Sequence, residues 1–204
     1  ASTKKIVLSI FDKKILLVDA DPQGNASTGM GISYDNRNPS LYDLIVSGEY
    51  NENAIKKTIV PGLDIITANT NLAASEIELV GVEKREFVIS KILSETKGYD
   101  YILIDCPPAL GLLTINSLVA SHSVIVPLQS EFFALEGISS LVSSIELIRE
   151  NFNSKLFIEG ILLTMVDKRN SLSALVEKDV RDHFGETVYK TTIPRNVKVS
   201  EAPS

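Results

Sequence analysis

Residues Ile15 to Asn25 read Ile-Leu-Leu-Val-Asp-Ala-Asp-Pro-Gln-Gly-Asn. Four consecutive apolar residues without alternation predict a strand that is buried on both faces, as in a parallel sheet. Asp19 and Asp21 follow one residue apart, so both carboxylates should point the same way where the strand ends. Pro22 cannot donate a ladder hydrogen bond and therefore ends the strand. Ligands of open α/β sheets bind at the carboxyl ends of the strands, which makes this stretch a candidate site.

A second stretch repeats the arrangement. Residues 101–105 (Tyr-Ile-Leu-Ile-Asp) form another apolar run that ends in an acid, Asp105, and Pro107 and Pro108 follow closely. Carboxylates that converge at strand ends suit a hydrated Mg²⁺ beside a phosphate, because Mg²⁺ takes one or two carboxylates and keeps several waters. The alternative is that these aspartates are N-caps of the helices that follow. Both interpretations can hold together.

The remaining hydrophobic pattern alternates between strand and helix periods, which predicts an α/β fold with a doubly wound, mostly parallel sheet flanked by helices. Residues 26–39 are polar and are expected to form a loop. Pro107 and Pro108 are expected to open a helix, since the first turn needs no amide donor. Strands are expected at 4–10, 63–68, 101–105, 123–128, 157–166 and 187–190, and helices at 40–46, 72–79, 84–96, 110–120, 132–151 and 171–184.

Length and composition agree with one large α/β domain. The 204 residues are 44% hydrophobic and 23% charged, as in ordinary globular proteins. No apolar run approaches transmembrane length, and the single cysteine, Cys106, agrees with a reducing compartment, where we expect it to be a core thiol. The net charge of −6 means that any nucleic-acid binding must come from a local basic patch.

The two acid-tipped stretches resemble the deviant-Walker ATPases of the ParA/Soj/MinD group, and most closely the ParA/Soj partition ATPases. Two further stretches support the resemblance: residues 126–137 (Val-Pro-Leu-Gln-Ser-Glu-Phe-Phe-Ala-Leu-Glu-Gly) and residues 193–204 (Ile-Pro-Arg-Asn-Val-Lys-Val-Ser-Glu-Ala-Pro-Ser). The last is distinctive of ParA/Soj. The resemblance implies a P-loop NTPase fold over residues 1–204 as a single nucleotide-binding domain.

The resemblance also implies roles for the three acids. The residue at the position of Asp21 orients or activates the water that attacks the γ-phosphate of ATP. Asp105 matches the acid that binds Mg²⁺ through water. Asp19 matches a second acid near the metal, and a supporting hydrogen-bond role for it is equally open.

For the nucleotide base, the resemblance points to two segments, one containing Thr164, Met165 and Asp167 and the other Pro194, Arg195 and Asn196. The planar guanidinium of Arg195 could stack on adenine. Two basic residues fall at positions that resemble DNA-binding residues of the family, Arg169 and Lys198. Lys168, Lys178 and Lys190 could add to that patch, although ordinary solvated charge is the alternative for each lysine.

The chain lacks one part of the family pattern. A ParA-like protein carries a Lys-Gly-Gly-x-Gly-Lys-Thr phosphate loop and a helix between its first two strands, whereas four residues separate Ile10 from Ile15 and no glycine precedes Gly24. Four residues span at most ~14 Å, too little to return along a parallel strand of ~17 Å. A hairpin is the alternative. We expect a segment to be missing between about residues 10 and 11, and a helical part after Ser204. A true deletion would leave a protein unable to hold ATP.

The leading hypothesis is a cytoplasmic, nucleoid-associated partition ATPase. ATP and Mg²⁺ would support a homodimer that binds DNA without sequence preference, and a ParB-type partner would stimulate hydrolysis. A MinD-like membrane-cycling ATPase is one alternative, which would need a C-terminal amphipathic helix. A non-catalytic binding module without the phosphate loop is the other. A nitrogenase-type iron protein is disfavoured, because Cys106 is the single cysteine.

Overall fold

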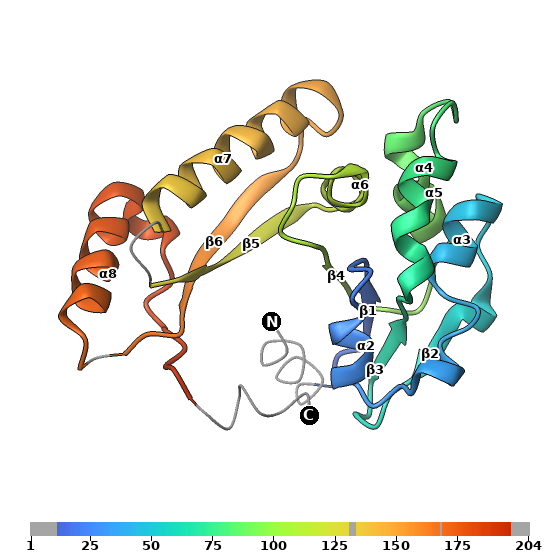
Figure 1. Ribbon diagram of the computed structural model, residues 1–204, viewed down its shortest axis with the longest axis horizontal. Helices are drawn as coiled ribbons and strands as arrows, with labels where there is room; N and C mark the ends of the chain where they lie inside the picture. The colour runs from blue at the N-terminus through green and yellow to red at the C-terminus, as the bar shows by residue number, and fades with distance from the viewer. Residues whose placement is uncertain (1–11, 131–133, 168, 197–204) are drawn as a thin grey trace. The chain divides into compact units, whose positions relative to one another are not determined.

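The computed structural model describes residues 12–130, 134–167 and 169–196. These residues fall into two compact units that meet in the sequence between Ala120 and Ser121. Figure 1 labels the helices and strands of both. The expected strand at 4–10, the expected gap beside residue 11 and the first residues of the expected helix at 132–151 lie outside the described residues.

The first unit is built on a four-stranded sheet with the order β2-β3-β1-β4. Its strands are β1 (Ile15–Asp19), β2 (Ile55–Lys57), β3 (Leu63–Ile66) and β4 (Tyr101–Asp105). Strand β1 pairs in parallel with β3 and with β4, and the register of the second pair places Asp19 opposite Asp105. The parallel sheet expected from the apolar runs is therefore confirmed, and the two acid-tipped strands are neighbours.

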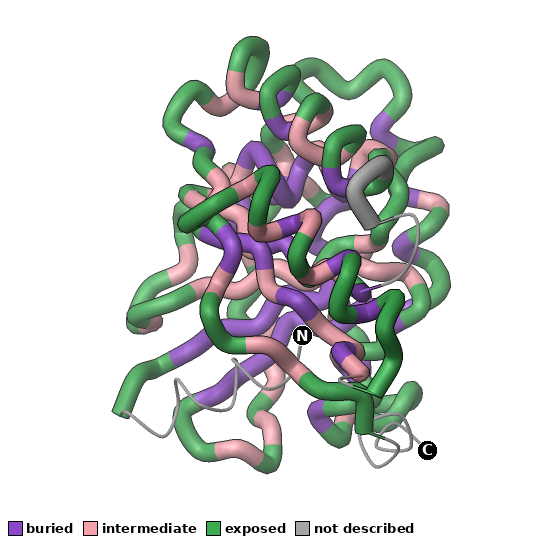
Figure 2. Tube along the Cα trace, turned by 90° about the vertical axis from the view of Figure 1, so that its left-hand side faces the viewer, coloured by how far each residue is buried: buried purple, intermediate pink, exposed green. Residues whose placement is uncertain are grey.

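Strand β1 is buried on both faces, as its uninterrupted apolar run predicts. Leu16 and Val18 pack into one hydrophobic cluster with helices α3 (Leu41–Ser47), α5 (Val88–Ser94) and α6 (Leu112–Val119). Ile15 and Leu17 pack into another cluster on the opposite face. This alternation is the period of two that a strand imposes on its side chains. Figure 2 colours the buried residues of the chain purple.

Helix α3 lies within one residue of the expected 40–46 at each end. Ser40 and Asp43 form a capping box, and Gly48 ends the helix in the left-handed conformation.

Three expectations about other segments of the first unit were wrong in detail. Residues 26–39 contain α2 (Asn25–Gly29) and the 3-10 helix η1 (Tyr34–Asn36), not only loop, and α6 begins after Gly111, so Pro107 and Pro108 lie outside its first turn. The expected helices at 72–79 and 84–96 each begin as a 3-10 helix, with the bounds η3 (Thr70–Ala74), α4 (Ser75–Glu78) and η4 (Arg85–Phe87).

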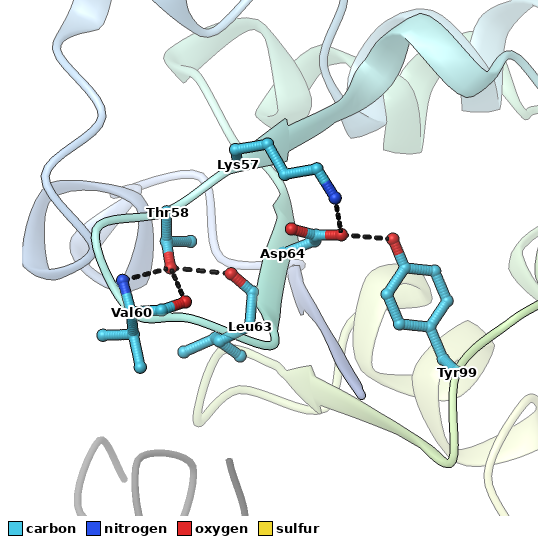
Figure 3. A network of polar contacts seen from close by, with 6 residues as sticks. All are labelled: Lys57, Thr58, Val60, Leu63, Asp64 and Tyr99. Atoms are coloured by element: carbon cyan, nitrogen blue, oxygen red, sulfur yellow. Dashed lines mark hydrogen bonds and ion pairs between the residues drawn. The ribbon is translucent and has the colours of Figure 1, made fainter. Parts of the chain in front are cut away.

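The short strand β2 was not expected from the sequence. It follows the 3-10 helix η2 (Glu52–Ala54) and pairs antiparallel with β3 at one end of the strand order. The buried carboxylate of Asp64 on β3 accepts hydrogen bonds from Lys57 Nζ and Tyr99 Oη, both at 2.7 Å (Figure 3). Burial, followed by the neighbouring carboxylate, raises the pKa of Tyr99. These contacts hold β2 and the segment before β4 to β3.

The second unit contains two parallel strands and two helices. Strands β5 (Ser123–Gln129) and β6 (Phe157–Thr164) pair in parallel, and α7 (Ala134–Asn151) and α8 (Ser171–Phe184) share a hydrophobic cluster with them. The strand expected at 187–190 is wrong. The 3-10 helix η5 (Gly185–Thr187) occupies its start, and Val188 makes a single bridge to Ile161.

Cys106 also differs from expectation, because it is exposed and not a core thiol. Strand β4 lies at one end of the strand order, and its residues are only partly buried, unlike those of β1. The run of apolar residues before Cys106 therefore did not indicate how deeply this residue lies.

Candidate functional site

The first candidate region is the pair of acids at the carboxyl ends of β1 and β4. Asp19 and Asp105 are register partners, and Asp19 is fully buried whereas Asp105 is partly exposed. Asp21 follows on the turn after β1 and is also partly exposed. The carboxylates that the sequence singled out therefore gather at one edge of the sheet, which is the edge where open α/β sheets bind ligands.

Asp19 is held by donors from its own turn. Its Oδ2 accepts hydrogen bonds from the backbone amide of Ser27 at 2.7 Å and from Ser27 Oγ at 2.6 Å, and its Oδ1 accepts from the amide of Asp21 at 3.3 Å. Burial raises the pKa of Asp19 above its ordinary value of 3.8, while these donors lower it again and Asp105 adds a small increase. Both carboxylate oxygens are used within the protein, which favours the supporting hydrogen-bond role.

Asp21 has a different environment. Its Oδ1 accepts a hydrogen bond from the amide of Gln23 at 3.0 Å, the pattern of an Asx turn. Gly24 then adopts the left-handed conformation, with φ of +63°, and its amide donates to the carbonyl of Asp21 at 2.9 Å. The turn thus fixes the backbone of Asp21 and leaves its side chain partly exposed at the sheet edge.

A buried arginine, Arg37, contacts residues on both sides of this turn. Arg37 is 7% exposed, and its guanidinium donates to Thr28 Oγ1 at 2.7 Å and to the carbonyl of Ala68 at 3.2 Å. A Cβ on Gly24 would lie 2.2 Å from Arg37 Nη1, so only glycine leaves room for this contact. Arg37 therefore joins the turn after β1 to the end of β3.

The acids suit a hydrated Mg²⁺ and not a cation that needs many protein ligands. Among the residues that the structure describes, no cluster of three or more acidic, histidine or cysteine side chains could hold a metal ion. Mg²⁺ needs only one or two carboxylates because it retains its waters. Asp105, partly exposed beside the buried Asp19, has the donor chemistry for this mode of binding.

The second candidate region is a cavity of about 230 Å³ in the second unit. Three of the residues expected to bind the base line it, namely Met165, Asp167 and Arg195. The other lining residues are Ser130, Asn170, Leu172 and Ser173.

The backbone holds the two expected segments together. Val166 and Pro194 form a parallel bridge, and the amide of Arg195 donates to the carbonyl of Val166 at 3.0 Å. Met165 adopts a positive φ of 55°, which is uncommon for a side chain of this kind. Of the remaining expected residues, Thr164 donates to the carbonyl of Leu128 at 3.3 Å.

Pro194 and Asn196 are both exposed, and neither they nor Thr164 line the cavity. Three of the six residues that the sequence predicts to bind the base therefore line one cavity. The other three lie beside it in the chain. The role of all six residues in binding a base remains a prediction.

Arg169 and Asp167, which the sequence assigned to different tasks, form an ion pair. Arg169 Nε lies 3.2 Å from Asp167 Oδ1, and Arg169 Nη2 lies 3.3 Å from Oδ2. The hydrogen bonds from Arg169 lower the pKa of Asp167. The Arg169 side chain is 92% exposed. Lys178 and Lys190 are exposed as well, whereas Lys168 and Lys198 lie outside the described residues.

Several residues of both regions escaped the sequence analysis. Ser27 and Arg37 lie in a polar stretch that was expected to be loop, and their burial has no signal in the local pattern. Ser130 follows the end of β5, so the strand-end rule that singled out the aspartates could have found it. Asn170 is the N-cap of α8, and its side chain accepts a hydrogen bond from the amide of Leu172 at 3.0 Å.

No described helix has both the length and the hydropathy needed to cross a bilayer.

Comparison with known proteins identifies the family. Residues 5–158 match a family model described as an AAA domain. The chain is 49% identical to the chromosome partitioning protein ParA of Caulobacter vibrioides, over 97% of this chain and 75% of that protein. It is also 49% identical to the sporulation initiation inhibitor protein Soj of Bacillus subtilis, over 97% and 78%.

A solved structure agrees in fold. Cobyrinic acid a,c-diamide synthase from Mycobacterium smegmatis, with a bound ATP analog and magnesium, superposes with a TM-score of 0.89 at 33% identity, covering 99% of this chain and 83% of that one. The α/β fold of the P-loop NTPases is thereby confirmed. The chain belongs to the ParA/Soj family of partitioning ATPases, whose cofactors are ATP and Mg²⁺.

Proposed function

We propose that this protein is a partition ATPase whose ATP-bound dimer binds DNA without sequence preference and is released by hydrolysis. The relatives that carry chromosome-partitioning names are 41–49% identical to the chain, against 33% for the diamide synthase. This difference favours partition over amide synthesis as the activity.

The observation that carries the proposal is the pairing of β1 with β4, which brings Asp19 and Asp105 to the same sheet edge, next to Asp21. Phosphoryl transfer depends mainly on positioning and on charge stabilisation. Asp105 would hold Mg²⁺ through water, and the metal would neutralise charge on the phosphates. Asp21, on a turn fixed by Gln23 and Gly24, would orient or deprotonate the attacking water.

Asp19 has a supporting part in this scheme. Its hydrogen bonds to Ser27 fix the start of α2 behind the acid-bearing turn. A negative charge on Asp19, beside Asp105, would add to the attraction for a cation. Because Asp19 is buried, its carboxylate would not contact the waters around the metal. We therefore assign Asp19 to positioning and Asp105 to metal binding.

The cavity in the second unit supports a nucleoside site. Met165 and Leu172 supply apolar surface, while Asp167 and Arg195 supply an acceptor and a planar donor. Most of the lining is polar, so the two apolar side chains would contact the face of the ring and the polar groups would bond to its edge. We propose that the base of ATP binds here, with Thr164, Pro194 and Asn196 as flanking residues.

The DNA surface would use exposed cations of the second unit. Arg169 is 92% exposed, and its pairing with Asp167 uses two of its five N–H donors, so three remain for phosphate. Lys198 would join it. A ParB-type partner would stimulate hydrolysis, and the protein would work in the cytoplasm on the nucleoid.

One observation favours a second function. No glycine precedes Gly24, so the described chain offers no cradle of glycine amides for the triphosphate. If the phosphate loop is truly missing, the same scaffold would be a binding module without turnover. We prefer the ATPase because the acids that such a module would not need are positioned at the sheet edge.

DNA binding tests the proposal. Fluorescence anisotropy with a duplex of arbitrary sequence should show binding with MgATP and weak binding with MgADP, and the affinity should fall steeply with salt. Arg169→Ala should weaken binding, whereas Arg149→Ala, which removes an equal charge from an ion pair on α7, should not. Equal binding with both nucleotides at all salt concentrations would contradict the proposal.

A further inference from the structure

The carboxylate of Asp167 lies on the cavity wall but is already engaged by Arg169, a residue that does not line the cavity. Arg169 donates three hydrogen bonds to this carboxylate. Its backbone amide donates to Oδ1 at 3.0 Å, its Nε to Oδ1 at 3.2 Å, and its Nη2 to Oδ2 at 3.3 Å. The hydrogen bonds from Arg169 also lower the pKa of Asp167, which keeps this carboxyl ionised near neutral pH.

The count of lone pairs shows what remains for a ligand. An ionised carboxylate offers about two acceptor positions on each oxygen. The two donors on Oδ1 occupy both of its positions, and the single donor on Oδ2 leaves one position open. Asp167 therefore presents one free acceptor position to a ligand.

None of the other described polar side chains that line the cavity has the two neighbouring oxygens of a carboxylate. Ser130 Oγ and Ser173 Oγ are both buried and bond to each other at 2.7 Å. Asn170 Oδ1 accepts the hydrogen bond that caps α8. Arg195 only donates. Among the described lining residues, Asp167 is the one carboxylate.

We propose that Arg169 is a specificity-determining residue that makes this pocket select adenine over guanine. The proposal rests on the proposed function, in which this cavity binds the base. Adenine carries a single amine donor on this edge, which matches the one free carboxylate position of Asp167. Guanine carries two parallel donors, N1–H and the 2-amine, which match a carboxylate with both oxygens free. Because Arg169 donates to both oxygens of Asp167, the carboxylate cannot accept the two parallel hydrogen bonds from guanine.

The test removes Arg169 and compares the two purines. Isothermal titration calorimetry of the full chain with MgATP and MgGTP would give both dissociation constants. In Arg169→Ala the freed carboxylate should bind guanine in a bidentate manner, and the preference for ATP over GTP should fall about tenfold, the scale of one such base contact. The side chain is largely exposed and pairs only with Asp167 among the described residues, so the variant should fold normally.

Two further variants separate the proposal from a general charge effect. Arg149→Ala removes a cation from an exposed pair with Glu146 on α7, and the ATP-to-GTP ratio should stay unchanged. Adding Asp167→Asn to Arg169→Ala removes one carboxylate oxygen and should abolish the gain in GTP binding.

The outcomes are distinguishable. If the unaltered protein binds ATP and Arg169→Ala leaves the ATP-to-GTP ratio unchanged, the inference is overturned and the proposed function stands. If the gain in GTP binding persists in the double variant, Asp167 is not the acceptor and the inference is again overturned. If the unaltered protein binds neither nucleotide, the proposed function fails and the inference fails with it.

Discussion

At the scale of single residues, three aspartates lie at the carboxyl ends of β1 and β4, and the sequence predicted this placement. Each of the two strand-end acids follows an apolar run, and the parallel pairing of β1 with β4 brings Asp19 and Asp105 together as expected. The sequence did not predict how differently the two are buried. That difference depends on Ser27, eight residues further along the chain, and on the position of β4 at one end of the strand order.

The burial of Asp19 leads to a pH-dependent prediction. Its pKa is raised in the folded state, so the folded protein binds this proton more tightly than the unfolded chain does. The contribution of Asp19 to stability is therefore largest near and below its ordinary pKa of 3.8 and is lost as the pH rises through the raised pKa.

Asp19→Asn tests this sign. The variant replaces an acceptor of two Ser27 donors by an amide and should lose about 1–3 kcal/mol of unfolding free energy. The loss should be larger at pH 4 than at pH 7, because only the unaltered protein gains stability on acidification at this site. Urea denaturation at both pH values measures it. A loss that is smaller at pH 4 would show that the pKa of Asp19 is not raised.

The turn between β1 and α2 shows, at the scale of elements, why local patterns were insufficient. Helix α2 has five residues and no apolar period, so a stretch of Asn, Ala, Ser, Thr and Gly looks like loop. Its position depends on hydrogen bonds with two residues that lie outside the helix, Asp19 and Arg37. Helix α8, which is long and has a clear apolar period, was predicted to the residue. Strand β2, with three residues, depends on its pairing with β3 and on the Asp64 contacts.

Gly24→Ala should damage this turn. The residue has a positive φ, and its Cβ would lie 2.2 Å from Arg37 Nη1, a group that is buried and bonded on two sides. The left-handed backbone and the overpacking together should cost about 2–5 kcal/mol, measured by chemical denaturation. Gly137→Ala on α7, where a Cβ meets nothing within 4 Å, is the control and should be neutral or stabilising by up to about 1 kcal/mol. Equal effects of the two substitutions would contradict the role of Gly24.

At the scale of the whole molecule, the chain has the fold and the family of the partitioning ATPases, but its sequence contains no glycine-rich phosphate loop before β1. Family membership rests on matches that cover nearly all of the chain. The sequence predicted the α/β class because strand and helix periods alternate, whereas the loop could not be located, because the residues that should carry it are not in the chain. We propose that the native protein contains a further segment between about residues 10 and 11.

Intact-mass spectrometry of the protein isolated from its native cells tests this proposal. The 204 residues account for 22.3 kDa, and a protein with a phosphate loop and its helix should be clearly heavier. Peptide mapping should then place extra residues after Ile10. A mass of 22.3 kDa would mean that the loop is truly absent and would favour the binding module.

ATP turnover by the unaltered protein and by Asp21→Ala tests the central claim most directly. With Mg²⁺ and DNA present, the unaltered protein should hydrolyse ATP, and Asp21→Ala should bind ATP and DNA but turn over roughly 10²–10⁴-fold more slowly, the range for loss of a positioned acid or base. Glu186→Ala, which removes an exposed acid of η5, should hydrolyse ATP at the unaltered rate. Unchanged hydrolysis by Asp21→Ala would remove this residue from the mechanism and contradict the account.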